Sequence, residues 1–368
     1  MKERRVRVGL GARSYAIAIA PRIVDNVGER LRLLIESRTR ALVVSNTTVW
    51  PLYGAPVRAG LESAGFDVVV HLVDDGERFK RLAEVERAIG AAVSGDLERG
   101  DPVIAVGGGV VGDLAGLVAA LFMRGTPVVH VPTTLLAQID SSVGGKVAVN
   151  HSMGKNLIGV FHQPVAVYSD PDTLATLPGR ELRAGLFEAV KYGVLADAAL
   201  FSWIGENLEV LRRAESTSVA RLAERCCRIK ARIVAADERE AGIRRYLNLG
   251  HTAGHALETV TRYRRFRHGE AVGYGIEVAA ELSRASGRLT DAESLAVREL
   301  VGRVGRRPEI SDLDPGELVA AMRHDKKRSA GRIGFVLPVA IGSVVFEPAV
   351  AERDIMRALR AVARGTVV

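Results

Sequence analysis

The stretch VIAVGGGVVGD, residues 103–113, predicts a strand, a glycine-rich turn and the start of a helix. It opens with apolar, partly β-branched residues that are typical of a buried strand, and a glycine cluster follows directly. Glycines let backbone amides approach a phosphate at the start of a helix. The spacing GxGxxG occurs at Gly107, Gly109 and Gly112, but the acidic residue expected about twenty positions later is absent. Alone, this stretch leaves a dinucleotide site and tight packing both open.

On both sides of this stretch, short β-branched segments alternate with segments of helical period. The strand-like segments are ALVVS (41–45), DVVVHLV (67–73) and PVVHVP (127–132), and apolar residues recur at helical spacing over residues 81–93. Strand and helix alternation predicts a largely parallel sheet with helices on both faces.

The pattern of apolar residues changes near residue 178. Helical period predominates afterwards, as in residues 221–236, and a short β-like segment at 333–337 predicts a hairpin or an edge strand. We therefore predict an α/β domain over residues 1–178 and a mostly helical domain over residues 179–368.

The composition indicates a packed globular protein with an anionic partner. Of the 368 residues, 48% are hydrophobic and 26% are charged, which argues against disorder. The net charge of +8 fits a phosphorylated metabolite as well as a nucleic acid. Acidic residues are interspersed among the basic ones, which favours the small anion and solvated faces over a nucleic acid. The adjacent Cys226 and Cys227 cannot bridge distant segments and favour a reducing cytoplasm.

Two apolar stretches raise the question of a membrane. The run at residues 103–123 contains Asp113 and a glycine cluster, so it favours a strand, a loop and a buried helix over a membrane span. The run at residues 16–20 is too short for the core of a signal peptide and predicts an opening strand. We expect no membrane partner.

Two further loops of the first half carry groups that suit an anionic ligand. PTTLLAQIDSSVGGK (132–146) combines paired threonines, an aspartate and a lysine beside a glycine pair. NHSMGKNLIG (150–159) adds Lys155 and Asn156. Three such loops in close succession favour a dinucleotide or anion site over simple turns.

Candidates for a metal site lie in three motifs of the second half: Glu188 in GLFEAVKYG, His251 and His255 in NLGHTAGHALE, and His268 in RHGEAVGYG. Zinc accepts imidazole and carboxylate ligands, and a catalytic site keeps three protein ligands so that a substrate oxygen can bind. Each residue also has a purely structural interpretation, and Glu188 could pair with Lys191 on a helix. The clustering of three of the eight histidines favours a site.

Taken together, these motifs resemble the successive signatures of 3-dehydroquinate synthases. The resemblance runs in order from DDGERFK at Asp74 to HDKK at His324, over most of the chain. It implies a Rossmann-like amino-terminal α/β domain that binds NAD and a mostly helical carboxyl-terminal domain that binds metal, with the active site in the cleft between them. We also expect a cytoplasmic homodimer.

The resemblance implies a carbon–oxygen lyase of the shikimate pathway that depends on NAD and on Zn²⁺, or Co²⁺ in its place. The family converts 3-deoxy-D-arabino-heptulosonate 7-phosphate to 3-dehydroquinate and phosphate by transient oxidation, elimination, reduction, ring opening and aldol closure. Two enzyme classes remain as alternatives: another sugar phosphate cyclase, making 2-epi-5-epi-valiolone or 2-deoxy-scyllo-inosose, and a metal-dependent polyol dehydrogenase. A nucleic-acid-binding protein would leave Glu188, His251 and His268 without a role.

Carried over motif by motif, the resemblance assigns three sets of residues. The cofactor set is Glu77, Lys80, Gly108, Gly109, Val110, Asp113, Thr133, Thr134, Lys155, Thr173, Leu174 and Thr176. The zinc set is Glu188, His251 and His268. The substrate set is Arg124, Asp140, Lys146, Asn156, Lys191, Lys230, Arg244, Asn248, His255 and Lys326, with Glu240 as a further carboxylate. In the register of the motifs, Lys327 could replace Lys326, and Arg245 could replace Arg244.

Overall fold

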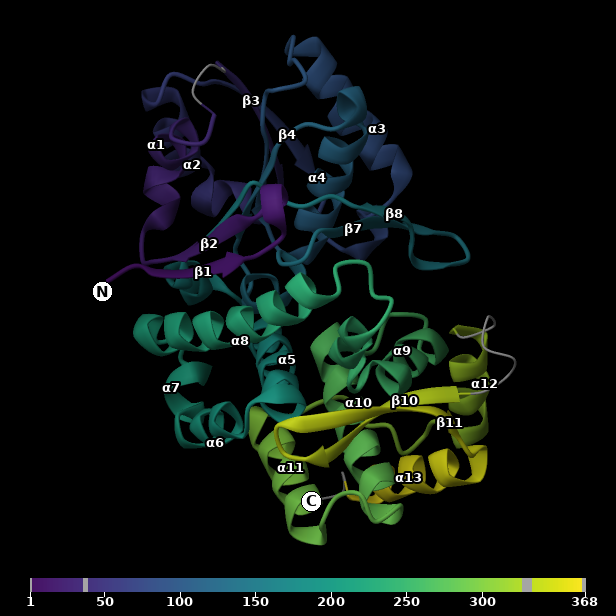
Figure 1. Ribbon diagram of the computed structural model, residues 1–368. Helices are drawn as coiled ribbons and strands as arrows, with labels where there is room; N and C mark the ends of the chain where they lie inside the picture. Colours follow the sequence, from purple (N-terminus) through teal and green to yellow (C-terminus); the bar gives the residue numbers. More distant parts are fainter. Residues whose placement is uncertain (1, 36–38, 326–332, 366–368) are drawn as a thin grey trace. The chain divides into compact units, whose positions relative to one another are not determined.

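The computed structural model describes residues 2–35, 39–325 and 333–365. The chain divides into two compact units: Met1–Leu177 with Ala214–Arg239, and Pro178–Arg213 with Glu240–Val368 (Figure 1). The segment Ala214–Arg239, which the sequence prediction assigns to the second domain, therefore packs with the first unit.

A seven-stranded sheet in the order β1-β2-β9-β6-β5-β3-β4 forms the centre of the first unit. All neighbouring strands run parallel except β1 and β2. The largely parallel sheet and the predicted strands are confirmed. The strands are β1 (Arg4–Val8), β2 (Tyr15–Ile19), β3 (Arg40–Asn46), β4 (Asp67–Val73), β5 (Val103–Gly107), β6 (Val128–Pro132) and β9 (Ala166–Ser169).

Helices cover both faces of this sheet. Along β5 successive side chains alternate between two apolar clusters: Val103 and Ala105 join the one that holds α4, and Ile104 and Val106 join the other. Each of the valine and isoleucine side chains contributes about 1.5–3 kcal/mol when fully buried. The helices of this unit are α1 (Val27–Arg32), α2 (Trp50–Ser63), α3 (Leu82–Ser94), α4 (Gly109–Leu121) and α8 (Ser216–Ala236).

An antiparallel hairpin of β7 (Lys146–His151) and β8 (Gly154–Phe161) extends from the first unit beside α4. The run at residues 103–123 forms β5 and the buried helix α4, as predicted. Among the described residues, no helix combines the length and apolar character that crossing a bilayer requires.

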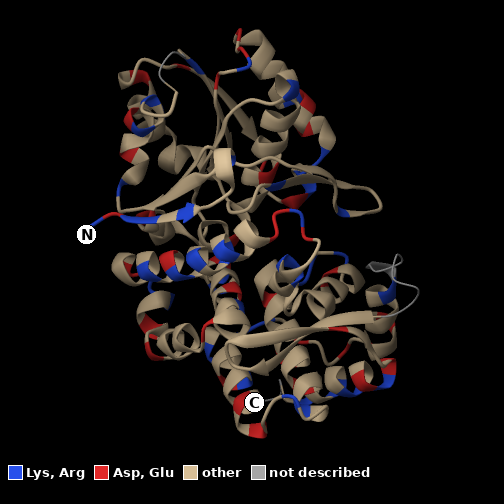
Figure 2. Cartoon of the chain, viewed as in Figure 1, with Lys and Arg blue, Asp and Glu red and all other residues tan. Residues whose placement is uncertain are grey.

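The second unit is mostly helical, as predicted, and carries one antiparallel hairpin of β10 (Ile333–Ala340) and β11 (Ser343–Val350). Nearly every residue of its central helix α10 is buried. Basic and acidic residues are interspersed along the chain in both units (Figure 2). The helices are α5 (Gly179–Ala196), α6 (Ala198–Glu206), α7 (Leu208–Arg212), α9 (His251–Val260), α10 (His268–Ala285), α11 (Asp291–Val304), α12 (Pro315–Asp325) and α13 (Glu352–Gly365).

Glycines allow α10 to touch its neighbours at backbone distance. A Cβ atom on Gly269 would lie 1.9 Å from the carbonyl oxygen of Ala184 in α5. A Cβ atom on Gly275 would lie 1.7 Å from the carbonyl oxygen of Gly250, just before α9. Since both neighbours are backbone atoms, they cannot rotate aside. The glycines of HGEAVGYG thus bring three helices close together at the end where the histidines lie.

His130 on β6 is buried, and burial lowers its pKa to about 4. In the unfolded chain a histidine titrates near about 6.5, so protons bind preferentially to the unfolded state below that pH. The contribution of the buried, neutral His130 to stability is present above about pH 6.5 and is lost as the pH falls toward about 4. The quantity to compare is the fall in the free energy of unfolding between pH 7 and pH 4. We expect this fall to be about 3 kcal/mol smaller in His130→Leu than in the unaltered protein. Urea unfolding at both pH values measures this, and equal pH dependence would contradict it.

Candidate active site

The predicted cofactor residues follow strands whose carboxyl ends meet at one edge of the sheet. β5, β6 and β9 are adjacent and parallel, and ligands of such sheets bind outside this edge. The structure therefore brings most of the cofactor set together. After β5 come Gly108, Gly109, Val110 and Asp113, after β6 come Thr133 and Thr134, and after β9 come Thr173, Leu174 and Thr176.

The start of α4 is shaped to accept an anionic group closely. A Cβ atom on Gly108 would lie 3.0 Å from Cγ2 of Thr134, and one on Gly109 would lie 3.1 Å from the hydroxyl of Ser141. The hydroxyl of Thr133 is buried and has no hydrogen-bond partner among the described residues. Backbone amides at a helix start, crowded glycines and an unsatisfied hydroxyl together fit the phosphates of a dinucleotide.

Lys80 ties three predicted residues into one network. Its ammonium group pairs with the carboxylate of Asp113 and donates a hydrogen bond of 2.5 Å to Oδ1 of Asn156. Burial raises the pKa of Asp113, and the Lys80 charge opposes that shift. Lys80 itself is buried. This network holds a cation and a carboxylate where α4 begins.

Glu77 and Lys155 lie beside this network. Nδ2 of Asn150 donates to Oε1 of Glu77 at 2.8 Å, and Nζ of Lys155 lies 4.0 Å from the same oxygen. Oδ1 of Asn150 accepts from the backbone amide of Asn156 at 2.9 Å. Asn150 was not predicted, although it opens the motif NHSMGKN. It links both sides of the β7–β8 hairpin to the cofactor residues.

The returning helix α8 delivers Lys230 to the first unit. Nζ of Lys230 donates to the backbone oxygen of Asp140 at 2.8 Å and to Oδ1 of the same residue at 2.7 Å. Cys227, one turn earlier, donates its thiol to the carbonyl of Gln138, and burial raises the pKa of that thiol to about 12. Cys227 is therefore a packing residue, because a thiol with so high a pKa is not a nucleophile near neutral pH.

Three further predicted substrate residues are exposed, at the other edge of the sheet, or outside the described residues. Lys146 is exposed at the start of β7. Arg124 precedes β6, so it lies at the opposite edge of the sheet from Thr133, with a left-handed φ of 66°. Lys326 and its alternative Lys327 fall outside the described residues.

In the second unit, Glu188 and Lys191 lie one turn apart on α5 and are both fully buried. Nζ of Lys191 lies 2.6 Å from Oε2 of Glu188. Within the part of the chain that the structure describes, the other carboxylate oxygen, Oε1, has no hydrogen-bond partner. A buried carboxylate oxygen in that state is costly, and such oxygens commonly serve as metal ligands.

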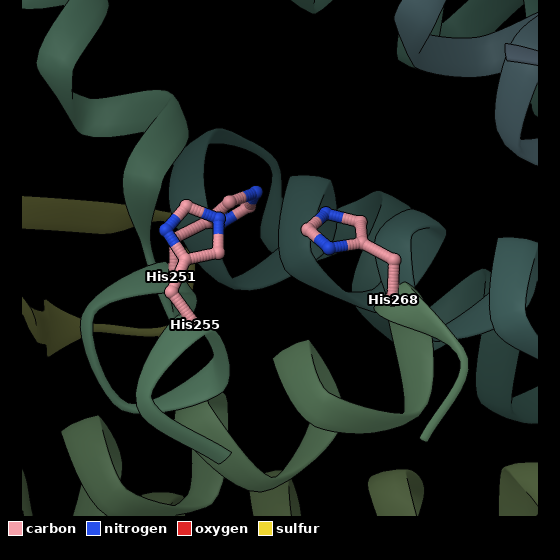
Figure 3. Close-up of side chains that lie close together, drawn as sticks. All are labelled: His251, His255 and His268. Carbon is pink, nitrogen blue, oxygen red and sulfur yellow. The ribbon is translucent and has the colours of Figure 1, made fainter. Parts of the chain in front are cut away.

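Three histidine rings from α9 and α10 lie close together, and two of them approach this carboxylate (Figure 3 shows the three rings). Oε1 of Glu188 lies 3.7 Å from Nε2 of His251 and 3.6 Å from Nε2 of His268. Donor atoms of a tetrahedral zinc site are about 3.3–3.4 Å apart, because each bond is about 2.0–2.1 Å long. The ring centroid of His255 lies 5.3 Å from that of His251, and ligand nitrogens of all three rings lie within 4.8 Å of one another.

Hydrogen bonds decide which nitrogen of each ring is available. Nδ1 of His251 bonds to the carbonyl of Leu249 at 3.1 Å, and Nδ1 of His268 bonds to Oε2 of Glu258 at 3.1 Å. A carbonyl and an ionised carboxylate only accept, so each Nδ1 carries the hydrogen and each Nε2 keeps its lone pair. Burial lowers the pKa of His251 well below its usual value, with further effects from Lys191 and the two other histidines. Both Nε2 atoms are thus prepared as metal ligands.

The donor atoms therefore fit a zinc ion in either of two combinations. One is the predicted set of Glu188, His251 and His268, and the other is formed by the three histidines. Glu258 was not predicted as part of this geometry. The sequence signal that could have found it is the spacing: Glu258 follows His251 by seven residues, which places both on the same face of a helix. The structure shows that Glu258 is buried on α9.

The segment η7 (Ile243–Asn248) carries the predicted residues Arg244 and Asn248, and Glu240 lies just before it. Nδ2 of Asn248 donates to Oε1 of Glu240 at 2.9 Å. Arg244 is buried, whereas the guanidinium of Arg245 donates to the carbonyls of residues 241 and 242 and lies 4.9 Å from the ring of Phe346. Arg245 thus serves local packing, which favours Arg244 as the substrate residue.

Two family models match the chain in succession. The 3-dehydroquinate synthase N-terminal model matches residues 70–184, and the 3-dehydroquinate synthase C-terminal model matches residues 185–328. The chain belongs to the 3-dehydroquinate synthase family. A 3-dehydroquinate synthase from Desulforamulus reducens is 46% identical over 355 residues, covering 96% of this chain and 99% of the relative. Another, from Pelotomaculum thermopropionicum, is 46% identical over 358 residues, covering 97% and 96%.

The fold of the 3-dehydroquinate synthase family is also seen in a solved cyclase. The structure of 2-epi-5-epi-valiolone synthase from Streptomyces hygroscopicus, with NAD⁺ and Zn²⁺ bound, aligns with a TM-score of 0.84 at 30% identity. The alignment covers 95% of this chain and 97% of that protein. Both halves of the 3-dehydroquinate synthase architecture, the α/β unit and the helical unit, are therefore shared with an enzyme that binds a nicotinamide cofactor and a metal.

Proposed function

We propose that this chain converts 3-deoxy-D-arabino-heptulosonate 7-phosphate to 3-dehydroquinate and phosphate, as an NAD- and zinc-dependent carbon–oxygen lyase of the shikimate pathway. The observation that carries the proposal is the convergence of Nε2 of His251 and Nε2 of His268 on the unsatisfied Oε1 of buried Glu188. The identity of 46% to 3-dehydroquinate synthases, against 30% to the valiolone synthase, supports this cyclase over its relatives. We also propose that the protein acts as a cytoplasmic homodimer.

The site residues divide by role. Glu188, His251 and His268 hold the metal, and the residues at the carboxyl edge of the sheet hold NAD. When bound, zinc supplies a Lewis acid that lowers the pKa of a substrate hydroxyl, and NAD supplies a hydride acceptor that is regenerated within the reaction. In this assignment residues 1–178 form the NAD-binding domain and residues 179–368 the metal-binding domain, with α8 returning Lys230 to the first unit.

The substrate carries a carboxylate and a phosphate, so its site requires several cations. We assign this role to Lys146, Lys191, Lys230, Arg244 and Lys326. Among the described members Lys191, Lys230 and Arg244 are buried, and a charge in such surroundings acts more strongly than one in water. We assign Arg124, Asn156, Asn248 and His255 to hydrogen bonds with the same anion.

Acidic partners hold two of these cations in place before substrate arrives. Lys191 pairs with Glu188, and Lys230 pairs with Asp140. A side chain that is already ordered loses little conformational entropy when the anion binds. Glu240 orders Asn248 in the same way through a hydrogen bond of 2.9 Å. Asp140 and Glu240 thus position groups that contact the substrate, and Glu188 does so in addition to holding the metal.

The decisive experiment follows phosphate release by the purified protein supplied with the heptulosonate phosphate, NAD and zinc. We expect release that requires all three additions, with no net change in absorbance at the NADH band. Net NADH would indicate a polyol dehydrogenase instead. Turnover of a ketose phosphate that lacks the carboxylate, without turnover of the heptulosonate, would indicate another cyclase.

Asp113 provides a separate test of the cofactor site. In Asp113→Ala, Lys80 loses its ion-pair partner at the start of α4, so we expect the dissociation constant for NAD to rise roughly 10- to 100-fold. Isothermal titration calorimetry measures this. The control is Asp67→Ala, because Asp67 is exposed at the start of β4, the opposite edge of the sheet. Equal NAD affinity in both variants would remove Asp113 from the site.

A further inference from the structure

We propose that Glu258 is a positioning residue for the metal site, which holds the His268 ring in the tautomer and orientation that present Nε2 to a divalent cation. The proposal rests on the proposed metal binding by Glu188, His251 and His268. Oε2 of Glu258 lies 3.1 Å from Nδ1 of His268, and its side chain is 3% exposed.

The position of Glu258 on α9 makes this contact specific. Residues 251, 255 and 258 follow the helical repeat of three and four, so they share one face of the helix. Two of them are the histidines of the cluster. Glu258 thus comes from the helix that carries His251 and reaches the ring of His268 at the start of α10, and it links the two helices that supply the nitrogens.

The two candidate ligand rings are held by different acceptors. His251 bonds to a neutral backbone carbonyl, whereas His268 bonds to a carboxylate. Hydrogen bonds to an ionised group are shorter and stronger than neutral ones, and a carboxylate behind a histidine raises the basicity of the opposite nitrogen. Glu258 therefore improves Nε2 of His268 as a ligand, in addition to fixing the ring.

The balance of charge points to the same role. Lys191 lies 2.6 Å from Glu188 and offsets the charge of the one carboxylate in the proposed ligand set. Further negative charge nearby would stabilise a divalent cation bound there. Glu258 supplies it through His268 without occupying a coordination position. The cation in turn offsets the cost of burying this carboxylate.

The test compares zinc affinity in Glu258→Ala, Glu258→Gln and the unaltered protein, by competition with a chromogenic chelator. We expect the dissociation constant to rise about 10- to 100-fold in Glu258→Ala. Glu258→Gln should fall between, because its amide oxygen accepts the same hydrogen bond without the charge. The visible spectrum of the Co²⁺-loaded protein should shift in the same order.

The matched control is Glu277→Gln. It removes a carboxylate that is also buried but lies on α10. Glu277 pairs with Arg307 at 2.8 Å and lies more than two turns beyond His268. We expect this variant to lose thermal stability and keep its zinc affinity. Unchanged zinc affinity in Glu258→Ala and Glu258→Gln, with lowered stability of the metal-free proteins, would overturn the positioning role and leave the proposed function standing. Absence of zinc binding by the unaltered protein would overturn both.

Discussion

His268→Ala should lose its bound zinc, whereas His255→Ala should keep zinc near full stoichiometry and still lose activity. The reason is geometric. Nε2 of His268 and Nε2 of His251 each lie within 3.7 Å of Oε1 of Glu188, so these three atoms can surround one ion. His255 is left beside the metal to hydrogen-bond the substrate, which a neutral or a protonated imidazole can do.

Sequence spacing alone would lead to the opposite expectation. Two histidines four apart on a helix suggest the zinc motif of metalloproteases, but that motif has a glutamate directly after its first histidine, and here the residue is Thr252. Metal analysis of both purified variants decides the matter, with His71→Ala on β4 as the control. Zinc lost from His255→Ala but retained in His268→Ala would replace the proposed ligand set by one that includes His255.

Lys146→Ala should lower turnover by about 10²- to 10³-fold, the usual loss when one preorganised group that stabilises developing charge is removed. Because Lys146 is exposed at the start of β7, its removal should leave the fold intact. Lys191→Ala should lower turnover to the same extent as Lys146→Ala. It also leaves the buried carboxylate of Glu188 without its ion-pair partner, so this variant should be less stable than the unaltered protein. Steady-state phosphate release and thermal unfolding separate the two effects. Near-normal release by Lys146→Ala would exclude it from the site, and Lys2→Ala serves as the control.

Composition holds a signal for these cations that motif matching does not use. The sequence contains only eight lysines among its 51 lysine and arginine residues, so most surface cations are arginines. Six of the eight lie in the predicted cofactor and substrate sets: Lys80, Lys146, Lys155, Lys191, Lys230 and Lys326. Arginine and lysine are interchangeable at solvated positions but not where a compact ammonium group must fit beside one carboxylate.

The strands were predictable because continuous runs of apolar β-branched residues indicate a sheet that is covered on both faces. DVVVHLV forms β4 over the same residues, and the β-like segment at 333–337 begins the hairpin β10–β11. β1 was missed as a strand because Arg4, Arg5 and Arg7 dominate its composition, although Val6 and Val8 alternate with them and are buried.

Helical period tells which face of a helix is apolar but not which unit that face packs against. This is why the residues of α8 could be recognised as a helix while their return to the first unit could not. The same limit applies to Glu258 and Asn150, whose importance depends on contacts with residues of other elements. The roles of the predicted site residues themselves stay predictions until the variants are measured.

The return of α8 also sets an order of events during synthesis. The sheet of the first unit is complete at Ser169, but α8, which packs on β1 and delivers Lys230 to Asp140, ends at Ala236. At about 5–20 residues per second, the ribosome needs roughly 3–13 s to make the chain between these points. During that interval the surface that receives α8 is uncovered on the nascent chain. A fragment ending at residue 177 keeps this surface uncovered permanently, so the amino-terminal half should be expressed together with α8 to remain in solution.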